Sequence, residues 1–195
     1  FGMDPNMVLA WHNYGGGKEA ASAMIEVLGS TGGKVAILHL KQAQSCILRV
    51  KGFREVIEAH NAKAGPKIDI VMELDGGGAR DIGYRAAEDA LQAHPDLKGI
   101  FAINDPSALG ARAALEKANK AEQITLIGFD GMREGKMAIK EGKIYADPIQ
   151  FPDRMGQEIV RAFESWSRGE AVPPEILIPT QLYRKADGEA DPDLR

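Results

Sequence analysis

The sequence has little cysteine and few aromatic residues, and no charge of one sign dominates it. Its single cysteine, Cys46, excludes an internal disulfide framework and a cysteine-based metal site. The formal net charge is −4, and no run of Lys or Arg stands out, so the chain has no basic surface for a nucleic-acid backbone or an anionic lipid. We therefore expect no nucleic-acid partner.

Long apolar runs and metal-type histidine spacings are also missing. No apolar stretch approaches the ~20 residues of a membrane-spanning helix. The four histidines lie at 12, 39, 60 and 94, and no two of them share a helix face at metal-binding spacing, so we expect no metal and no cofactor. Residues 1–7 show neither periodicity nor a signal-peptide pattern, and we expect them to be an added or cut end outside the fold.

The apolar residues that are present alternate between strand-length runs and longer segments of helical period. This alternation predicts an α/β fold in three layers, a parallel sheet with helices on both faces. The predicted strands are 8–11, 34–40, 68–74, 99–103, 124–129 and 144–149, with an extended run at 175–183. The predicted helices are 17–28, 45–64, 80–93, one beginning at 105, 132–141 and 152–168. We expect the acidic segment 186–195 to be a disordered tail.

Polar side chains follow three of these predicted strands. Ligands of open parallel sheets bind beyond the carboxyl ends of the strands, which points to Asn104, to Phe129 with Asp130, and to Gln150. Amides and a carboxylate suit neighbouring hydroxyl groups, and a phenyl face suits the C–H side of a sugar ring. Asp105 and Asp130 would also serve as helix caps. We interpret Asp105 as a cap and Asp130 as a ligand-binding residue.

The glycine clusters and the possible nucleophiles are weaker signals. Gly29–Lys34 lacks the Ser or Thr and the preceding strand of a phosphate loop, whereas Gly15–Gly17 after Asn13 would suit an anion at a helix start. Gly76–Gly78 would let a ligand approach the backbone, so Gly78 is a further candidate. Ser45 and Cys46 lie near a strand end without a GxSxG motif, which makes a hydrolase the least favoured alternative.

Four stretches together form a known pattern: RVKGF at 49–53, AHPDLKGIFAINDPSALGA at 93–111, LIGFDG at 126–131, and IKEGKIYADPIQFPDRMG at 139–156. The chain from about residue 13 to 183 resembles the type I periplasmic sugar-binding proteins, the ribose-binding group in particular. The resemblance implies the substrate-binding component of an ABC sugar importer, periplasmic or extracytoplasmic, without enzymatic activity, that works with a transporter permease. Sugar-responsive transcriptional repressors use the same fold and are the alternative.

The resemblance covers only the C-terminal lobe of such a protein and a segment that returns to the other lobe. It implies a ligand-binding lobe at 1–148, a piece of the absent N-terminal lobe at 149–172, and a returning strand at 173–185. The apolar stripe of the 152–168 helix then requires a cover. We expect a homodimer through this helix, a separately supplied N-terminal lobe, or refolding of the segment onto this lobe.

The family's sugar contacts fall on Asn104, Phe129, Asp130 and Gln150. One departure concerns the arginine that ribose binders place six residues before the Phe of their GF pair, because that position is Ile47 here. The nearby Arg49 matches a more structural arginine of the family. A branched alkyl group cannot form the forked hydrogen bonds of a guanidinium, so we expect a deoxy or less polar sugar, or another ligand.

Overall fold

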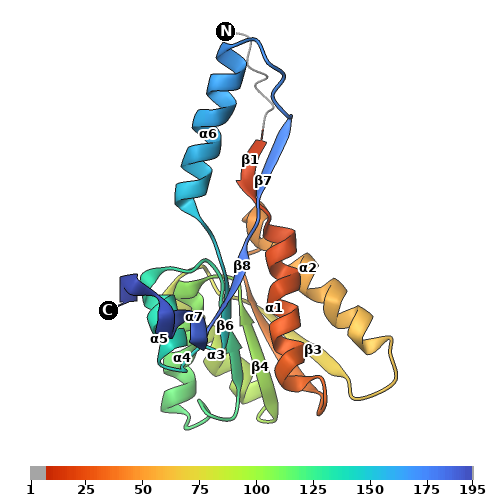
Figure 1. Ribbon diagram of the computed structural model, residues 1–195. Coiled ribbons are helices and arrows are strands. Elements are labelled where there is room, and N and C mark those ends of the chain that lie inside the picture. The colour runs from red at the N-terminus through yellow and green to blue at the C-terminus, as the bar shows by residue number, and fades with distance from the viewer. Residues whose placement is uncertain (1–7, 195) are drawn as a thin grey trace.

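The structure is a computed structural model that describes residues 8–194, and its main part is a six-stranded sheet (Figure 1). The strand order is β3-β2-β4-β5-β6-β8, and every neighbouring pair is parallel except β6 with β8. The strands are β2 (Gly33–His39), β3 (Ile68–Asp75), β4 (Leu97–Ala102), β5 (Thr125–Ile127), β6 (Ala146–Ile149) and β8 (Gln181–Arg184).

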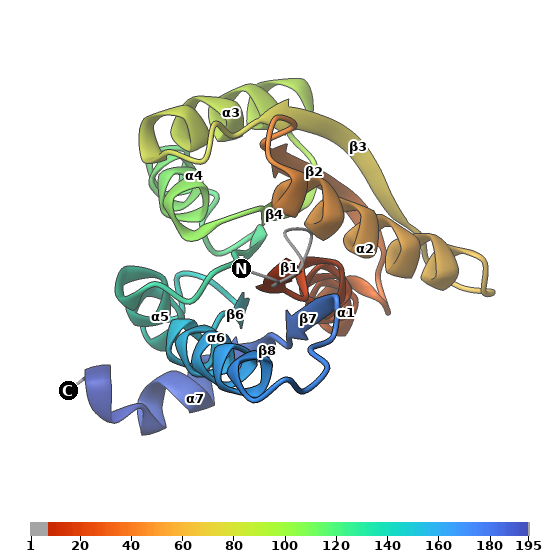
Figure 2. The same ribbon diagram turned by 90° about the horizontal axis from the view of Figure 1, so that it is seen from above.

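Helices cover both faces of this sheet, which confirms the predicted three-layer α/β class (Figure 2). Val35 and Ile37 of β2 pack against one pair of helices, α1 (Asn13–Leu28) and α2 (Gln44–Asn61). Ala36 and Leu38 point the other way. They pack under α3 (Arg80–Ala93), α4 (Asp105–Lys117) and α5 (Arg133–Lys140). This strict alternation along β2 is what a strand buried on both faces requires.

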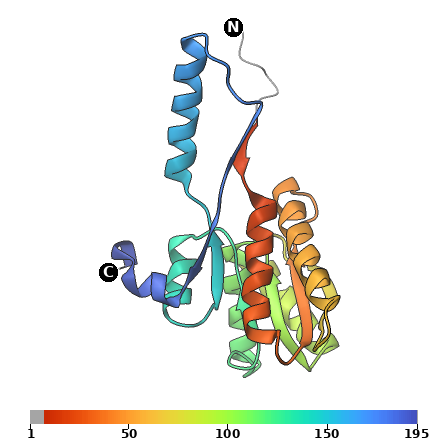
Figure 3. The same ribbon diagram turned by 45° about the vertical axis from the view of Figure 1, so that its right-hand side comes forward.

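A second, smaller part projects from the lobe (Figures 1 and 3). It contains β1 (Val8–Trp11), which pairs in parallel with β7 (Glu175–Ile178), and α6 (Pro152–Ser167). The predicted lobe boundary at 1–148 is therefore wrong at its start, because β1 joins β7 and not the main sheet. Refolding of the 152–168 segment onto the lobe is also not observed, and Ile159, Val160 and Phe163 of α6 are more than half exposed.

The predicted disordered tail is wrong for residues 186–194. This segment forms α7 (Lys185–Ala190) and a 3-10 turn at Pro192–Leu194. Leu194 is buried, and the Asp191 carboxylate accepts a hydrogen bond from the Tyr183 hydroxyl at 2.7 Å. One apolar anchor and this polar contact dock the segment beside α5, despite its acidic composition. Arg195 lies outside the described residues.

Two further boundaries differ from the predictions. The first helix begins at Asn13, so Gly15–Gly17 lie in the first turns of α1 and not in a loop before it. The extended run at 175–183 divides at Pro179 into β7 and β8, which belong to different sheets. In the described part of the chain, no helix is long and apolar enough to cross a bilayer.

A substitution in the stacked pair of Phe53 and Phe101 tests the packing of the core under α1 and α2. Both rings are fully buried, with centroids 4.5 Å apart. Phe53→Ala removes this contact and leaves a cavity, so we expect a loss of ~3–5 kcal/mol in the free energy of unfolding. Urea denaturation measures it. Glu58→Ala on the exposed side of α2 is the control and should change it by less than ~0.5 kcal/mol, and equal effects of the two substitutions would contradict this packing.

Candidate functional site

The carboxyl ends of β4, β5 and β6 bring together most of the residues predicted from the sequence. Asp130 follows β5 and forms a bridge with Ile149 of β6. The backbone N–H of Gln150 donates to the Asp130 carbonyl at 2.8 Å. Asp130 has a φ of 109°, a left-handed conformation that is rare outside glycine. Such strain persists only where the surroundings hold it, which is common at ligand sites.

Arg49 is the centre of the site's hydrogen bonds. Its Nη1 lies 2.8 Å from Asp130 Oδ1 and donates to the carbonyl of Ile103, at the end of β4, at 2.6 Å. Its Nε donates to Asn13 Oδ1 at 2.9 Å. The guanidinium therefore links α1, α2 and the ends of two strands. The family comparison had given Arg49 only a structural role, and sequence reasoning missed its contact with Asp130.

The structure corrects the predicted role of Phe129. It was predicted to offer its ring to a sugar, but its side chain is fully buried. Its face carries the Arg49 guanidinium, whose Cζ lies 3.8 Å from the ring centroid. A cation over an aromatic face is attracted by the ring quadrupole. Phe129 thus supports Arg49, and Arg49 in turn orients the Asp130 carboxylate.

The electrostatics of Asp130 combine two opposing effects. Burial raises the pKa of its carboxyl, and the adjacent Arg49 lowers it, with a net shift above the ordinary value. The side chain keeps 23% of its surface exposed, so it is accessible from outside. A carboxylate held by a guanidinium on one side has acceptor capacity left for donors on the other.

Asn104, and not Asp105 as predicted, is the N-cap of α4. Its Oδ1 accepts from the Ser107 backbone N–H at 3.1 Å, and its Nδ2 donates to the Gly78 carbonyl at 3.2 Å. Gly78 has a φ of 64°, which explains a glycine at this close approach. The Asp105 side chain instead turns inward and accepts from the Met132 N–H at 2.6 Å.

The remaining candidates differ in their surroundings. Gln150 has a buried Nε2 that finds no acceptor within residues 8–194. Asn13 is buried, and its Nδ2 donates to the Trp11 carbonyl, so it positions Arg49. Ile47 lies in the first turn of α2 and is 40% exposed. No contact of Ile47 with Arg49 or Asp130 stands out in the described structure.

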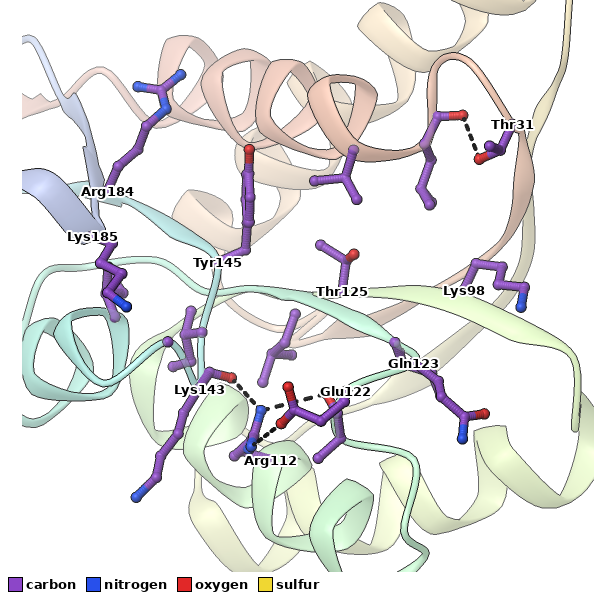
Figure 4. Close-up of a pocket in the computed structure, with 18 of the residues that line it drawn as sticks. Thr31, Lys98, Arg112, Glu122, Gln123, Thr125, Lys143, Tyr145, Arg184 and Lys185 are labelled. Carbon is purple, nitrogen blue, oxygen red and sulfur yellow. Dashed lines mark hydrogen bonds and ion pairs between the residues drawn. The ribbon is translucent and has the colours of Figure 1, made fainter.

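A pocket of about 720 Å³ lies elsewhere, beside the amino ends of the strands (Figure 4). It opens between Lys98 of β4, Thr125 of β5 and Tyr145 before β6. The charged Arg112 in it is already engaged, because it donates to the Lys143 carbonyl at 3.1 Å and pairs with Glu122 at 3.1 Å. Ligands of this fold class bind at the opposite end of the sheet, which keeps the strand ends at Asp130 as the candidate site.

The fold is that of a periplasmic binding protein. Residues 6–171 match the periplasmic binding protein domain, and the chain belongs to that family.

Among its relatives, the chain is 30% identical over 177 residues to the "Ribose import binding protein RbsB" of Salmonella typhimurium, covering 91% of this chain and 57% of that protein. It is 30% identical to the "D-apiose import binding protein" of Paraburkholderia graminis, covering 90% of this chain and 55% of that protein. The chain thus spans little more than half the length of these relatives.

Solved structures agree with the fold. An ABC transporter solute-binding protein from Actinobacillus succinogenes with bound D-allose superposes with a TM-score of 0.85 at 23% identity, over 94% of this chain and 62% of that one. The glucose-galactose binding protein GanP of Geobacillus stearothermophilus superposes with a TM-score of 0.83 at 25% identity, over 92% and 62%.

Arg49→Met tests the buried pair. It leaves the Asp130 carboxylate without its cation, and we expect a loss of ~3–5 kcal/mol in the free energy of unfolding at neutral pH. Without Arg49 the folded-state pKa of Asp130 rises further above its unfolded value, so the variant should lose stability as pH rises through that pKa. Denaturation at several pH values measures both effects.

The control for this experiment is Arg85→Met, because Arg85 and Asp81 form an exposed pair on α3. We expect a change of less than ~0.5 kcal/mol, independent of pH. An Arg49→Met protein as stable as the control would show that Asp130 does not depend on this ion pair.

Proposed function

We propose that this chain is the sugar-binding lobe of a solute-binding protein that serves an ABC importer. The observation that carries the proposal is that the partly exposed Asp130 carboxylate and the unpartnered Nε2 of Gln150 belong to residues at neighbouring strand ends, within residues 8–194. An acceptor and a donor at neighbouring strand ends suit two neighbouring hydroxyl groups of a sugar. Asn104, one strand along, is the third proposed contact.

The kinship of the chain supports this assignment over its alternatives. The ribose and D-apiose relatives are import binding proteins by name, which favours transport over a transcriptional repressor. Burial raises the pKa of the Cys46 thiol, so it is a poor nucleophile at neutral pH. A hydrolase is therefore disfavoured. A transport role implies an extracytoplasmic location and a permease partner.

We propose further that β1, β7 and α6 belong to a second lobe. β1 and β7 form a two-stranded sheet, which on its own is rarely stable in water. The apolar side chains of Ile159, Val160 and Phe163 lie on α6 with more than half of their surface exposed. These elements need further strands and a covering sheet, supplied by an N-terminal lobe or, in its absence, by a second copy of the chain.

Calorimetry across pentoses, hexoses and their deoxy forms tests sugar binding. Hydroxyls that face the missing half of the clamp stay in water, so we expect weak binding, with Kd above ~1 μM. Ile47 in place of a guanidinium predicts that deoxy sugars bind at least as well as their parents. Sub-micromolar binding by this chain alone would refute the half-clamp description.

Asp130→Ala should abolish whatever binding is found, because it removes the central acceptor. Asp89→Ala, an exposed carboxylate on α3, is the control and should leave the Kd unchanged. An unchanged Kd for Asp130→Ala would reduce Asp130 to a partner of Arg49 and overturn the proposed site.

Analytical ultracentrifugation tests whether a second copy of the chain covers the exposed apolar side chains of α6. If a second copy covers α6, replacing Ile159 and Phe163 together by Lys should convert a dimer to a monomer. The matched control is Arg154→Lys with Arg161→Lys on the same helix, which should leave the dimer intact. A wild-type chain that is monomeric at all concentrations would exclude the second copy and leave the N-terminal lobe as the cover.

A further inference from the structure

Two buried carboxyl groups lie directly behind the candidate site, and the function proposed so far does not use them. Asp105 is the first residue of α4, and Asp147 is the second residue of β6. Both side chains are fully buried. Each uses its Oδ2 to accept one backbone N–H of the segment that follows Asp130: Gly131 N donates to Asp147 at 2.8 Å, and Met132 N donates to Asp105 at 2.6 Å.

The other oxygen of each carboxyl points to a common space. Both Oδ1 atoms are buried, and neither finds a donor anywhere in the described chain. A Cβ placed on Gly128 would lie 2.8 Å from Asp147 Oδ1 and 3.4 Å from Asp105 Oδ1, so the two atoms converge over this glycine. Gly135 of α5 covers Asp105 from the other side, where a Cβ would lie 2.1 Å from Oδ1.

Two ionised carboxylates cannot remain at this place. Their repulsion is strong away from water, and no third His, Cys, Asp or Glu of the described residues joins them in a group that would hold a metal ion. A single proton resolves the conflict, because it gives both Oδ1 atoms a hydrogen bond and leaves only one negative charge. A second proton would find no acceptor, and each buried donor without an acceptor costs free energy.

We propose that Asp105 and Asp147 share one proton, and that this carboxyl pair holds the Gly131–Met132 backbone and thereby keeps the Asp130 carboxylate in its ligand-binding position. The inference rests on the proposed function for its last clause only. Asp105 and Asp147 are positioning residues, since they act on a ligand through the backbone next to Asp130.

The charged surroundings agree with a shared proton. Burial raises the pKa of Asp105 to about 7, and burial followed by repulsion from Asp105 and Asp130 raises the pKa of Asp147 well above its usual range. Of the neighbouring charges, Asp130 is neutralised by Arg49 of α2. On α5, Glu134 pairs with Arg80 of α3, Lys136 pairs with Asp191, and Arg133 is exposed. None of these cations replaces the proton.

The sign of the pH dependence follows from linkage. A carboxyl whose folded-state pKa lies above its unfolded value of ~3.9 stabilises the fold below that value, and the stability is lost as pH rises through the folded pKa. The native protein should therefore lose stability as pH rises from about 4 through the apparent pKa of this pair, which burial raises. The shared proton has one apparent pKa that belongs to the pair.

Asp147→Asn tests the proposal without a ligand. The amide keeps an oxygen for Gly131 N and offers Asp105 a permanent donor in place of the titratable proton. We expect wild type and variant to unfold alike at about pH 5, and the variant's folding equilibrium constant to exceed that of wild type by at least ~10-fold at about pH 8. Asp89→Asn, the exposed control, should follow wild type at every pH.

A ratio of the two constants that does not change with pH would overturn the shared proton. Asp105→Asn is the mirror variant and must give the same crossover. If either variant fails to fold, the infrared band of a protonated carboxyl decides: it should persist in the native wild-type protein at neutral pH and be absent on unfolding. Absence of that band from the native protein would also overturn the proposal.

D-ribose binding, measured by calorimetry, tests the link to the ligand site. The wild-type Kd should rise severalfold between about pH 6 and pH 8.5, whereas the Kd of Asp147→Asn should stay constant over the same range. Ionisation of Asp130 itself would strengthen hydroxyl binding with pH, which is the opposite trend. A parallel rise in wild type and variant would disprove the positioning role. If D-ribose and the other sugars fail to bind, the proposed function fails, and the stability crossover still decides whether the proton is shared.

Discussion

The buried ion pair between Arg49 and Asp130 is the interaction on which the rest of this site depends. Arg49 reaches the carboxyl ends of two strands from α2, and every polar contact that it makes is with a residue that ends or follows an element of the sheet or begins α1. A guanidinium suits this task because it presents several donors in a fixed plane and stays charged when it is buried. The ring face of Phe129 packs against the Arg49 guanidinium. The pair is costly to desolvate and would contribute little net stability compared with apolar packing, so its value lies in fixing where the Asp130 carboxylate points.

The layout of the fold follows from patterns that are visible in the sequence, whereas the roles of single side chains do not. Parallel strands buried on both faces leave continuous apolar runs, and these runs predicted the sheet. The rule of carboxyl ends then placed Asn104, Asp130 and Gln150 at one edge. Phe129 shows where that reasoning stopped short. The period-two alternation puts Phe129 on the same face as Ile127, under α1 and α2, and this signal should have assigned it to the core. The prediction of a disordered tail was wrong over residues 186–194 for another reason. The composition of the segment is polar, but one buried Leu194 and the contacts of Asp191 suffice to dock it.

Asn104 and Asp105 show that the sequence leaves the position of a helix N-cap uncertain by one residue. Both are good N-cap residues, and only the position at which the helix begins decides which side chain caps it. The structure gives the cap to Asn104 and turns Asp105 into the core. The role of Asp147 could not be predicted for a related reason. A single carboxyl inside an apolar strand has no sequence pattern that identifies the residue it will contact. The partner lies on α4, and only the folded chain shows that each of the two carboxyls was placed beside a glycine.

The position of Asp130 therefore depends on an ion pair on one side and on a pair of buried carboxyl groups on the other. In front, its carboxylate is neutralised by Arg49 and still accessible to donors. Behind, Asp105 and Asp147 hold the next two backbone N–H groups. A left-handed residue such as Asp130 keeps its backbone conformation only while both neighbours are fixed. The bridge to Ile149 fixes one side, and the carboxyl pair fixes the other. A proton between two aspartates thus becomes part of the binding geometry, because removing it would set two buried negative charges against each other and release the turn that carries the third.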